Sequence, residues 1–278
     1  MKNPFKTTSA IKHADWPYII QHFIYYLLLI AAGSLFFSGN ALLIAVCILT
    51  AFLIMVTFFH VYRIQKEENE NQTYKVQALN ELYNLLKIDA PLPPMSGWAA
   101  TPELTITILK QIITSKPELV VELGSGVSSV IICYGLKHYS PKGKLISIDH
   151  DEKYAKKTLT ELKTHGLENF ADLRIAPISE TELNTVKYYW YDRNKLIFPG
   201  KVDLVIIDGP PFSTQKNARY PALPILREYL SENGVIVMHD TNRDEEAGII
   251  KKWINDYPEF SVTHLNTDKG VSILKRNF

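Results

Sequence analysis

VELGSGVS, residues 121–128, joins the end of a predicted strand to the start of a predicted helix. Gly124 and Gly126 let the backbone turn sharply and approach a ligand closely, and the helix that begins near Ser128 offers unpaired N–H groups. A dinucleotide-binding fingerprint, Gly-x-Gly-x-x-Gly, would need glycine at position 129, which is Ser129. The stretch therefore predicts a strand–loop–helix cofactor site, but the glycines alone do not name the cofactor.

The segments on both sides of this loop alternate between strand-like and helix-like patterns. Strands are predicted at 119–123, 144–148, 172–175, 202–207, 234–238, 260–265 and 271–275. Helices are predicted at 101–114, 128–136, 152–164, 221–230 and 244–256. Such alternation is typical of an α/β domain with a parallel sheet covered on both faces. Because only residues 266–270 separate the last two strands, we expect these two to form an antiparallel hairpin.

Acidic residues stand near the ends of the first two predicted strands. Glu122 lies in the first strand, and Asp149 ends the second. An acid at the end of the second strand accepts hydrogen bonds from ribose hydroxyls in Rossmann-type sites. We expect Glu122 to support the loop. The predicted cofactor-binding residues here are Glu122, Gly124, Ser125, Gly126, Asp149 and His150.

Further segments follow in order along the chain: WYD at 190–192, VDLVIIDGPP at 202–211, RYPALP at 219–224 and HDTNR at 239–243. With the loop, they resemble the class I S-adenosylmethionine-dependent methyltransferases, in particular a group of bacterial enzymes with DGPP and RYPALP segments. The resemblance extends from about residue 96 to the C-terminus. It implies a Rossmann-like seven-stranded methyltransferase sheet that ends in an antiparallel hairpin, with S-adenosylmethionine as cofactor. Where such proteins usually carry Asp-Asp, this chain has His239 and Asp240.

Asp208 and His239 end two predicted strands at the edge where ligands bind in open α/β sheets. We predict that both are catalytic and that Asp208 also contacts the cofactor. Histidine ordinarily titrates near neutral pH, so His239 is a candidate general base for an acceptor hydroxyl. A capping or supporting role is the alternative for His239. If no base is needed, alignment of the acceptor with the methyl group carries the reaction.

A second interpretation joins Asp208 and Asp240 around a divalent metal ion that polarises the acceptor oxygen. The segment order is similar to that of metal-dependent O-methyltransferases of catechol type. The interpretation we favour has no metal, because His239 replaces one acid of the usual pair. Two other classes stay open: an oxidoreductase, which would need the missing third glycine, and a non-catalytic cofactor-binding membrane scaffold.

The first quarter of the chain is far more apolar than the rest. Two stretches contain no Asp, Glu, Lys or Arg: YIIQHFIYYLLLIAAGSLFF at 18–37 and ALLIAVCILTAFLIMVTFFHVY at 41–62. Each is long enough to cross a hydrocarbon core of about 30 Å as a helix. A cleaved signal peptide is the alternative for the first stretch, and the second stretch that follows at once argues against it. Residues 1–64 therefore predict an N-terminal tail and a hairpin of two transmembrane helices in the lipid bilayer.

Positive charges flank this predicted hairpin. Lys2, Lys6 and Lys12 precede the first span, and Arg63 and Lys66 follow the second. Because positive residues stay on the cytoplasmic side, we expect a two-span inner-membrane protein with both termini in the cytoplasm.

Residues 65–95 predict a stalk helix followed by a proline-rich linker, before a methyltransferase domain at 96–278. We expect the apolar stripe of the stalk to pack on the following domain, because it is too short for a coiled coil; dimerisation through the stalk or the membrane helices is the alternative.

The charge balance gives no electrostatic argument for nucleic acid, since 30 Lys and Arg face 29 Asp and Glu. The sequence thus predicts a membrane-anchored methyltransferase that O-methylates a small-molecule, sugar or envelope-precursor acceptor on the cytoplasmic face.

Overall fold

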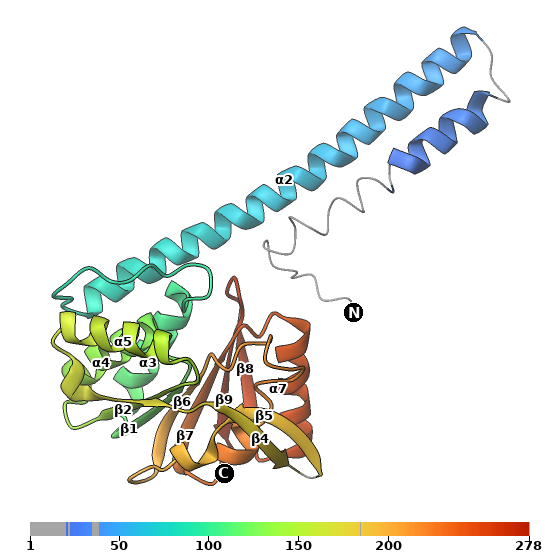
Figure 1. Cartoon of the computed structure of the whole chain (residues 1–278). Coiled ribbons are helices and arrows are strands. Elements are labelled where there is room, and N and C mark those ends of the chain that lie inside the picture. The colour runs from blue at the N-terminus through green and yellow to red at the C-terminus, as the bar shows by residue number, and fades with distance from the viewer. Residues whose placement is uncertain (1–20, 22, 35–38, 184, 278) are drawn as a thin grey trace. The chain divides into compact units, whose positions relative to one another are not determined.

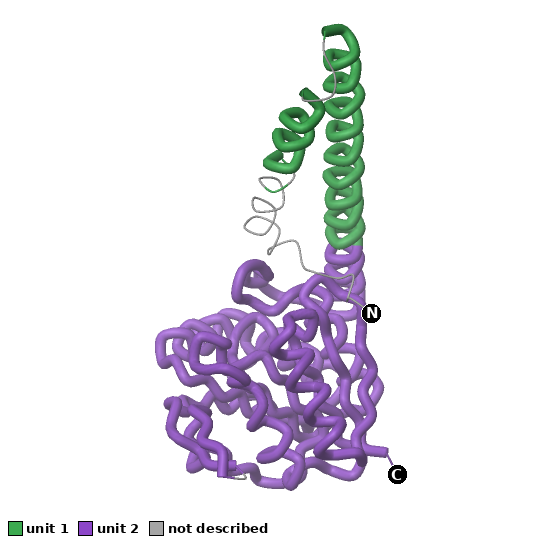
Figure 2. Tube along the Cα trace, turned by 90° about the vertical axis from the view of Figure 1, so that its right-hand side faces the viewer, with its two compact units in different colours: residues 1–73 green, residues 74–278 purple. Residues whose placement is uncertain are grey.

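The computed structural model describes residues 21, 23–34, 39–183 and 185–277. The chain divides into two compact units, residues 1–73 and residues 74–278, which Figure 2 shows in separate colours. The division falls inside one long helix, α2 (Asn40–Leu85).

A seven-stranded sheet forms the centre of the second unit (Figure 1). Its strands are β1 (Leu119–Leu123), β2 (Lys144–Asp149), β3 (Ala171–Ile175), β6 (Val202–Ile207), β7 (Leu230–His239), β8 (Phe260–Leu265) and β9 (Val271–Arg276). The strand order is β3-β2-β1-β6-β7-β9-β8. Neighbours from β3 to β7 are parallel, whereas β9 runs antiparallel to both β7 and β8. The predicted Rossmann-like seven-stranded sheet with a C-terminal antiparallel hairpin is confirmed.

Helices cover both faces of this sheet. One face carries α3 (Pro102–Ser115), α4 (Val127–Tyr139) and α5 (Glu152–Thr164), and the other carries α6 (Ala222–Leu226) and α7 (Asp244–Asp256). Short 3₁₀ turns lie at η1 (Glu168–Phe170) and η2 (Arg193–Lys195). Neighbouring residues of β1 point to opposite faces, so Val120 packs with the α3–α4 core and Val121 with the α6–α7 core. Strands buried on both faces explain the nearly continuous apolar runs in the sequence.

Local capping residues set where two of these helices begin. Thr101 accepts a hydrogen bond from the Leu104 N–H at 3.3 Å, and Pro102 occupies the first position of α3. Asp151 accepts from the Lys153 N–H at 2.8 Å at the start of α5. The cap of α5 lies immediately after β2, so it also helps to place the end of that strand.

Two elements differ from the sequence expectations. An antiparallel hairpin, β4 (Ile178–Leu183) and β5 (Val186–Tyr191), was not expected and pairs only with itself. Three of the four aromatic residues of β5, Tyr188, Trp190 and Tyr191, are buried against the α6–α7 core, and Tyr189 is exposed. The helix predicted at 221–230 is wrong in length: α6 ends at Leu226, because Leu230 already pairs with Val202 at the start of β7.

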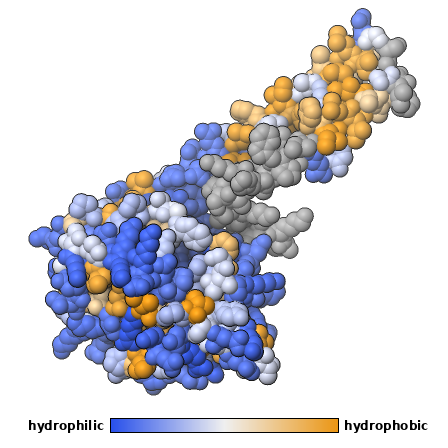
Figure 3. Space-filling model, in the orientation of Figure 1, coloured by the Kyte–Doolittle hydropathy of each residue, from blue (hydrophilic) through white to orange (hydrophobic). Residues whose placement is uncertain are grey.

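The described part of the first unit contains a short apolar helix, Phe23–Ser34, and α2 from Asn40 to Thr73. Apolar side chains cover the first half of α2 (Figure 3), and α2 joins the second predicted span and the predicted stalk in one helix. Among the described residues, α2 alone is long and apolar enough to cross a membrane. The ends of the first predicted span fall outside the described residues, so two membrane-spanning helices are not confirmed. The Tyr26 hydroxyl lies 2.6 Å from the Thr50 hydroxyl and links the two helices.

Candidate active site

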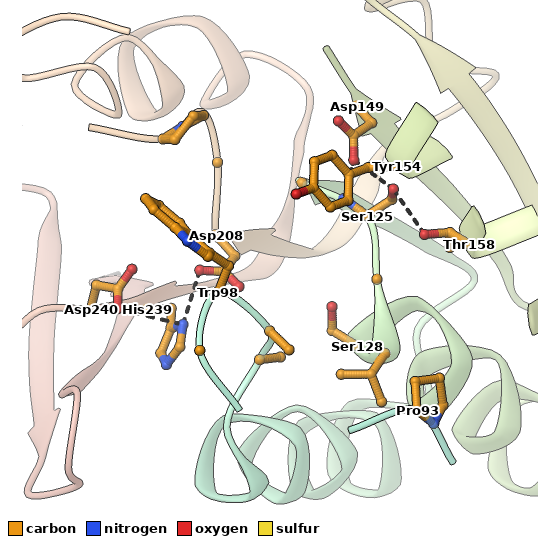
Figure 4. Close-up of a pocket in the computed structure, with 18 of the residues that line it drawn as sticks. Pro93, Trp98, Ser125, Ser128, Asp149, Tyr154, Thr158, Asp208, His239 and Asp240 are labelled. Atoms are coloured by element: carbon orange, nitrogen blue, oxygen red, sulfur yellow. Dashed lines mark hydrogen bonds and ion pairs between the residues drawn. The ribbon is translucent and has the colours of Figure 1, made fainter. Parts of the chain in front are cut away.

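A cavity of about 510 Å³ opens at the carboxyl edge of the sheet in the second unit. It lies where β1 and β6 are neighbours, and the strand order reverses between these two strands. Crevices at such a reversal are the usual ligand sites of open α/β sheets, and the volume is in the range of roughly 300–1,000 Å³ for small-molecule sites. Figure 4 shows two groups of polar side chains on opposite sides of the cavity, one around Asp149 and one around Asp208.

The loop after β1 forms one wall of the cavity. Gly124 has a φ of +94°, and a Cβ there would lie 3.2 Å from the backbone nitrogen of Gly209. This glycine therefore lets the ends of β1 and β6 approach each other. A Cβ on Gly126 would meet nothing within 4 Å, so the missing side chain leaves space in the cavity. The first residues of α4, Val127 and Ser128, line the cavity beside it.

Asp149 holds this loop through its carboxylate. Its Oδ2 accepts from the Ser125 N–H at 2.9 Å and from the Ser125 hydroxyl at 2.6 Å, and its Oδ1 accepts from the Asp151 N–H at 2.9 Å. Thr158 donates to the Ser125 hydroxyl at 3.1 Å. Burial raises the pKa of Asp149, but hydrogen bonds from His150, Ser125 and Asp151 outweigh it and bring the pKa below its usual value. An ionised carboxylate has about four acceptor positions, and these three hydrogen bonds leave about one for a ligand hydroxyl.

Glu122 is the predicted cofactor residue that the structure does not bring to the cavity. Its side chain is fully buried beneath the loop, where Oε2 accepts from the hydroxyls of Ser129 and Ser147. Burial raises the pKa of Glu122 to about 7 despite these hydrogen bonds. The other predicted residues line the cavity: Gly124, Ser125, Gly126, Asp149, His150 and Asp208. Glu122 is therefore placed to support the loop.

Asp208 and His239 form a hydrogen-bonded pair at the ends of β6 and β7. The Nδ1 of His239 lies 2.9 Å from Oδ1 of Asp208, and both residues line the cavity. Burial raises the pKa of Asp208, but its interaction with His239 and the charges of Arg219 and Lys269 outweigh this and hold the pKa below its usual value. An ionised Asp208 accepts a hydrogen bond from Nδ1–H of His239, which assigns the free lone pair of a neutral imidazole to Nε2. Among the described residues, Nε2 has no hydrogen-bond partner.

Arg219 is absent from the residues that the sequence pattern predicts for the site, although it lines the cavity beside this pair. Its guanidinium donates to the carbonyl oxygen of His239 at 3.0 Å and to Oδ2 of Asp240 at 2.9 Å. Arg243 also contacts Oδ2 of Asp240, at 3.0 Å. The available signal was an arginine at the start of the otherwise apolar RYPALP segment.

A divalent metal fits this group of residues poorly. Asp208, His239 and Asp240 each offer a ligand atom, and these atoms lie within 4.8 Å of one another. However, Oδ1 of Asp208 already accepts from His239 and lies 3.5 Å from the Arg219 guanidinium. Oδ2 of Asp240 contacts both Arg219 and Arg243. An added divalent cation would lie close to permanent positive charges that already balance the carboxylates.

The cavity is also lined by Trp98 and Lys269, which lie outside the motifs in the sequence. Trp98 is 72% exposed and stacks on Phe212, with ring centroids 5.9 Å apart. Lys269, from the loop between β8 and β9, donates to the Gly97 carbonyl at 2.6 Å. Tyr191 from the unexpected hairpin reaches the cavity, whereas its neighbours in the aromatic run do not line it.

The fold and a sequence match agree on the class of protein. A family described as a methyltransferase domain matches residues 121–241. This match begins in β1 and ends just after β7, so it includes the glycine loop, Asp149 and the Asp208–His239 pair. No curated protein matches the chain.

Solved structures with the same fold include O-methyltransferase TomG from Streptomyces achromogenes, in complex with S-adenosylmethionine. It has a TM-score of 0.55 and 12% identity, with 75% of this chain and 99% of that chain covered. The S-adenosylhomocysteine-bound Podospora anserina methyltransferase PaMTH1 has a TM-score of 0.54 and 16% identity, with 77% of this chain and 96% of that chain covered. The Bacillus cereus O-methyltransferase in complex with S-adenosylhomocysteine has a TM-score of 0.50 and 14% identity, with 74% of this chain and 91% of that chain covered. The domain match, together with this shared fold, supports an S-adenosylmethionine-dependent methyltransferase.

Proposed function

We propose that this protein is a membrane-anchored O-methyltransferase that modifies a small-molecule, sugar or envelope-precursor hydroxyl on the cytoplasmic face of the inner membrane. The observation that carries the proposal is the 2.9 Å contact between Asp208 and His239 in the same cavity as the glycine loop. A histidine oriented by a carboxylate is a general base with a defined proton-accepting atom. Such a base suits a hydroxyl acceptor, which must lose a proton during transfer.

The residues around the glycine loop fit S-adenosylmethionine. The open space at Gly126 admits a ligand close to the backbone. Asp149 is an ionised acceptor at the position where ribose hydroxyls bind in this kind of fold. His150 lines the same side of the cavity. In this proposal, Gly124, Ser125 and Gly126 hold the cofactor while Glu122 supports them from below.

When bound, S-adenosylmethionine would supply a methyl group from its sulfonium, and the electron pair of the carbon–sulfur bond would stay on sulfur. His239 accepts the proton of the acceptor hydroxyl on Nε2 as the oxygen–carbon bond forms. Asp208 accepts a hydrogen bond from Nδ1–H of His239 and stabilises the imidazolium that results. Trp98 and Tyr191 on the cavity wall exclude water and align the acceptor.

The membrane part of the proposal is supported by the apolar helix α2 and the hydrogen bond between Tyr26 and Thr50. An interhelical hydrogen bond inside an apolar pair of helices is typical of segments packed together in lipid. We propose that residues 18–37 and 41–62 cross the bilayer as a hairpin and that both termini are cytoplasmic. An enzyme held in this way acts on acceptors that are themselves in the membrane or at its surface.

The experiment that tests the proposed function is methyl incorporation from labelled S-adenosylmethionine into cell-envelope extracts by the full chain in detergent. His239→Ala should lower turnover by roughly 10²–10⁴-fold and leave cofactor affinity nearly unchanged, because the imidazole acts on the acceptor. His264→Ala is the matched control, since His264 lies on β8 bonded to Ser272 outside the cavity. Full turnover in a folded His239→Ala protein would show that His239 is not the base.

A further inference from the structure

Arg219 connects the two strand ends that carry the proposed base. Its side chain is only 5% exposed. One Nη2 atom donates to the carbonyl oxygen of Asp208 at 2.8 Å, and Nη1 donates to the carbonyl oxygen of His239 at 3.0 Å. The Nε atom also donates to the carbonyl of Pro210, at 3.4 Å. A single planar group therefore fixes the backbone of β6 and β7 immediately beside their reactive side chains.

The same guanidinium balances the buried acids around the base. It lies 2.9 Å from Oδ2 of Asp240, 3.5 Å from Oδ1 of Asp208 and 4.0 Å from Oε1 of Glu246. Buried carboxylates are costly without a cation close by. Arginine stays charged at all ordinary pH values, so this compensation is permanent.

We propose that Arg219 is a positioning residue that serves as the built-in cation of this site, in place of a divalent metal ion. The proposal rests on the proposed function, because it assigns Arg219 to the orientation of Asp208 and His239. The Arg219 side chain performs two roles that a metal ion would have: it contacts the carboxylates at the strand ends, and it neutralises their charge. The protein should therefore transfer methyl groups without any divalent ion.

The planar shape of the guanidinium is essential to this role. Its three nitrogens reach the carbonyl oxygens of Asp208 and Pro210, in the loop between β6 and α6, and of His239, the last residue of β7. A lysine ammonium carries the same charge, but it is a point charge and cannot make this set of contacts together. Arg219→Lys should thus preserve the charge but lose the orientation of Asp208 and His239. Arg219→Ala should lose both and leave a cavity of guanidinium shape.

The first test is chemical rescue in the full chain. Arg219→Ala should lower turnover on envelope extract by at least tenfold, with cofactor affinity changed much less, and added guanidinium ion should restore part of the turnover. Arg219→Lys should stay impaired. The matched control is Arg227→Ala, which removes an arginine that packs on Tyr257 outside the cavity. Its turnover should equal that of the wild type and should not change when guanidinium ion is added. Wild-type turnover in folded Arg219→Ala, or an unrescued loss equalled by Arg227→Ala, would overturn the proposal.

The second test needs no substitution at position 219, and its metal-binding measurement needs no acceptor. Manganese is titrated into the wild-type chain and followed by electron paramagnetic resonance. We expect no bound manganese ion whose signal is lost in Asp240→Asn. Turnover should survive excess chelator. A bound manganese ion that is lost in Asp240→Asn, together with chelator-sensitive turnover, would overturn the proposal and leave methyl transfer standing. Failure of the wild-type chain to bind S-adenosylmethionine or transfer methyl would instead overturn the proposed function and this inference with it.

Discussion

Asp149 has two roles that a substitution series can separate, because its carboxylate binds the Ser125 loop and also lines the cavity. Asp149→Ala should weaken S-adenosylmethionine binding by roughly 1–3 kcal/mol, through loss of charge-assisted hydrogen bonds. Isothermal calorimetry measures the change. Asp172→Ala, at an exposed acid on β3, is the control and should bind normally.

Ser125→Ala distinguishes the two roles of Asp149. This variant removes the hydroxyl contacts of Ser125 to the carboxylate and to Thr158, and it leaves the carboxylate facing the cavity. We expect a smaller loss of affinity than in Asp149→Ala. Equal losses would mean that Asp149 acts only by ordering the loop. Unchanged affinity in folded Asp149→Ala would rule out contact between the second-strand acid and the cofactor.

Glu122 should make the stability of the domain depend on pH. Its pKa is raised by burial from 4.5 to about 7 in the folded chain. The unfolded chain therefore releases this proton at lower pH than the folded chain does. The free energy of unfolding should fall as pH rises from about 4.5 to about 7 and then level off, by a few kcal/mol at most.

Glu122→Gln isolates this contribution, because the amide keeps its size and cannot ionise. Urea unfolding of the full chain in detergent, followed by tryptophan fluorescence between pH 5 and pH 8, should give a flatter profile for the variant. A difference between the two proteins that does not change with pH would contradict the prediction.

At the scale of elements, the C-terminal end of α2 is fixed to the methyltransferase fold. Ala78 and Leu82 of this helix are buried in the α3–α4 core. Lys75 lies 2.8 Å from Asp268, in the loop between β8 and β9, and this ion pair is mostly buried. The next residue, Lys269, lines the cavity. The helix end is therefore linked to the cavity rim through one short loop.

Asp268→Asn should loosen that loop. Loss of a partly buried ion pair is worth about 1 kcal/mol, which corresponds to roughly fivefold faster amide exchange at 266–270. Hydrogen exchange with mass spectrometry measures it. Glu70→Gln is the control, since the pair of Glu70 and Lys66 is exposed and should not affect the loop. Identical exchange in Asp268→Asn and wild type would mean that other contacts hold the loop.

For the whole molecule, the proposed topology places reporters fused at two different sites on opposite sides of the membrane. A reporter at the C-terminus should behave as cytoplasmic, because Arg63 and Lys66 follow the second span. A reporter inserted after Gly39, between the two predicted spans, should behave as periplasmic. Alkaline phosphatase and fluorescent-protein fusions report the two sides. A cytoplasmic signal at Gly39 would show that residues 18–37 do not cross, and a periplasmic signal at the C-terminus would reverse the topology.

Much of the fold could be predicted because its signals are local. The apolar strand runs, the Thr101 cap and the short connection at 266–270 each depend on neighbouring residues. The hairpin of β4 and β5 and the short α6 were missed because tertiary pairing decides them. Trp190 is buried only because the hairpin folds onto the α6–α7 core, and Leu230 becomes a strand residue only by pairing with Val202.

The sequence by itself determined the α/β class, the glycine loop and the acids and histidine at the strand ends. Only the tertiary structure decided how those groups are used. Register between β1, β6 and β7 turns Glu122 away from the cavity and brings His239 to Asp208. Arg219 reaches Asp240 from 21 residues away in the chain. Periodicity and motifs describe neighbours along the chain, whereas the charge balance of a buried site depends on contacts that form only when distant segments pack.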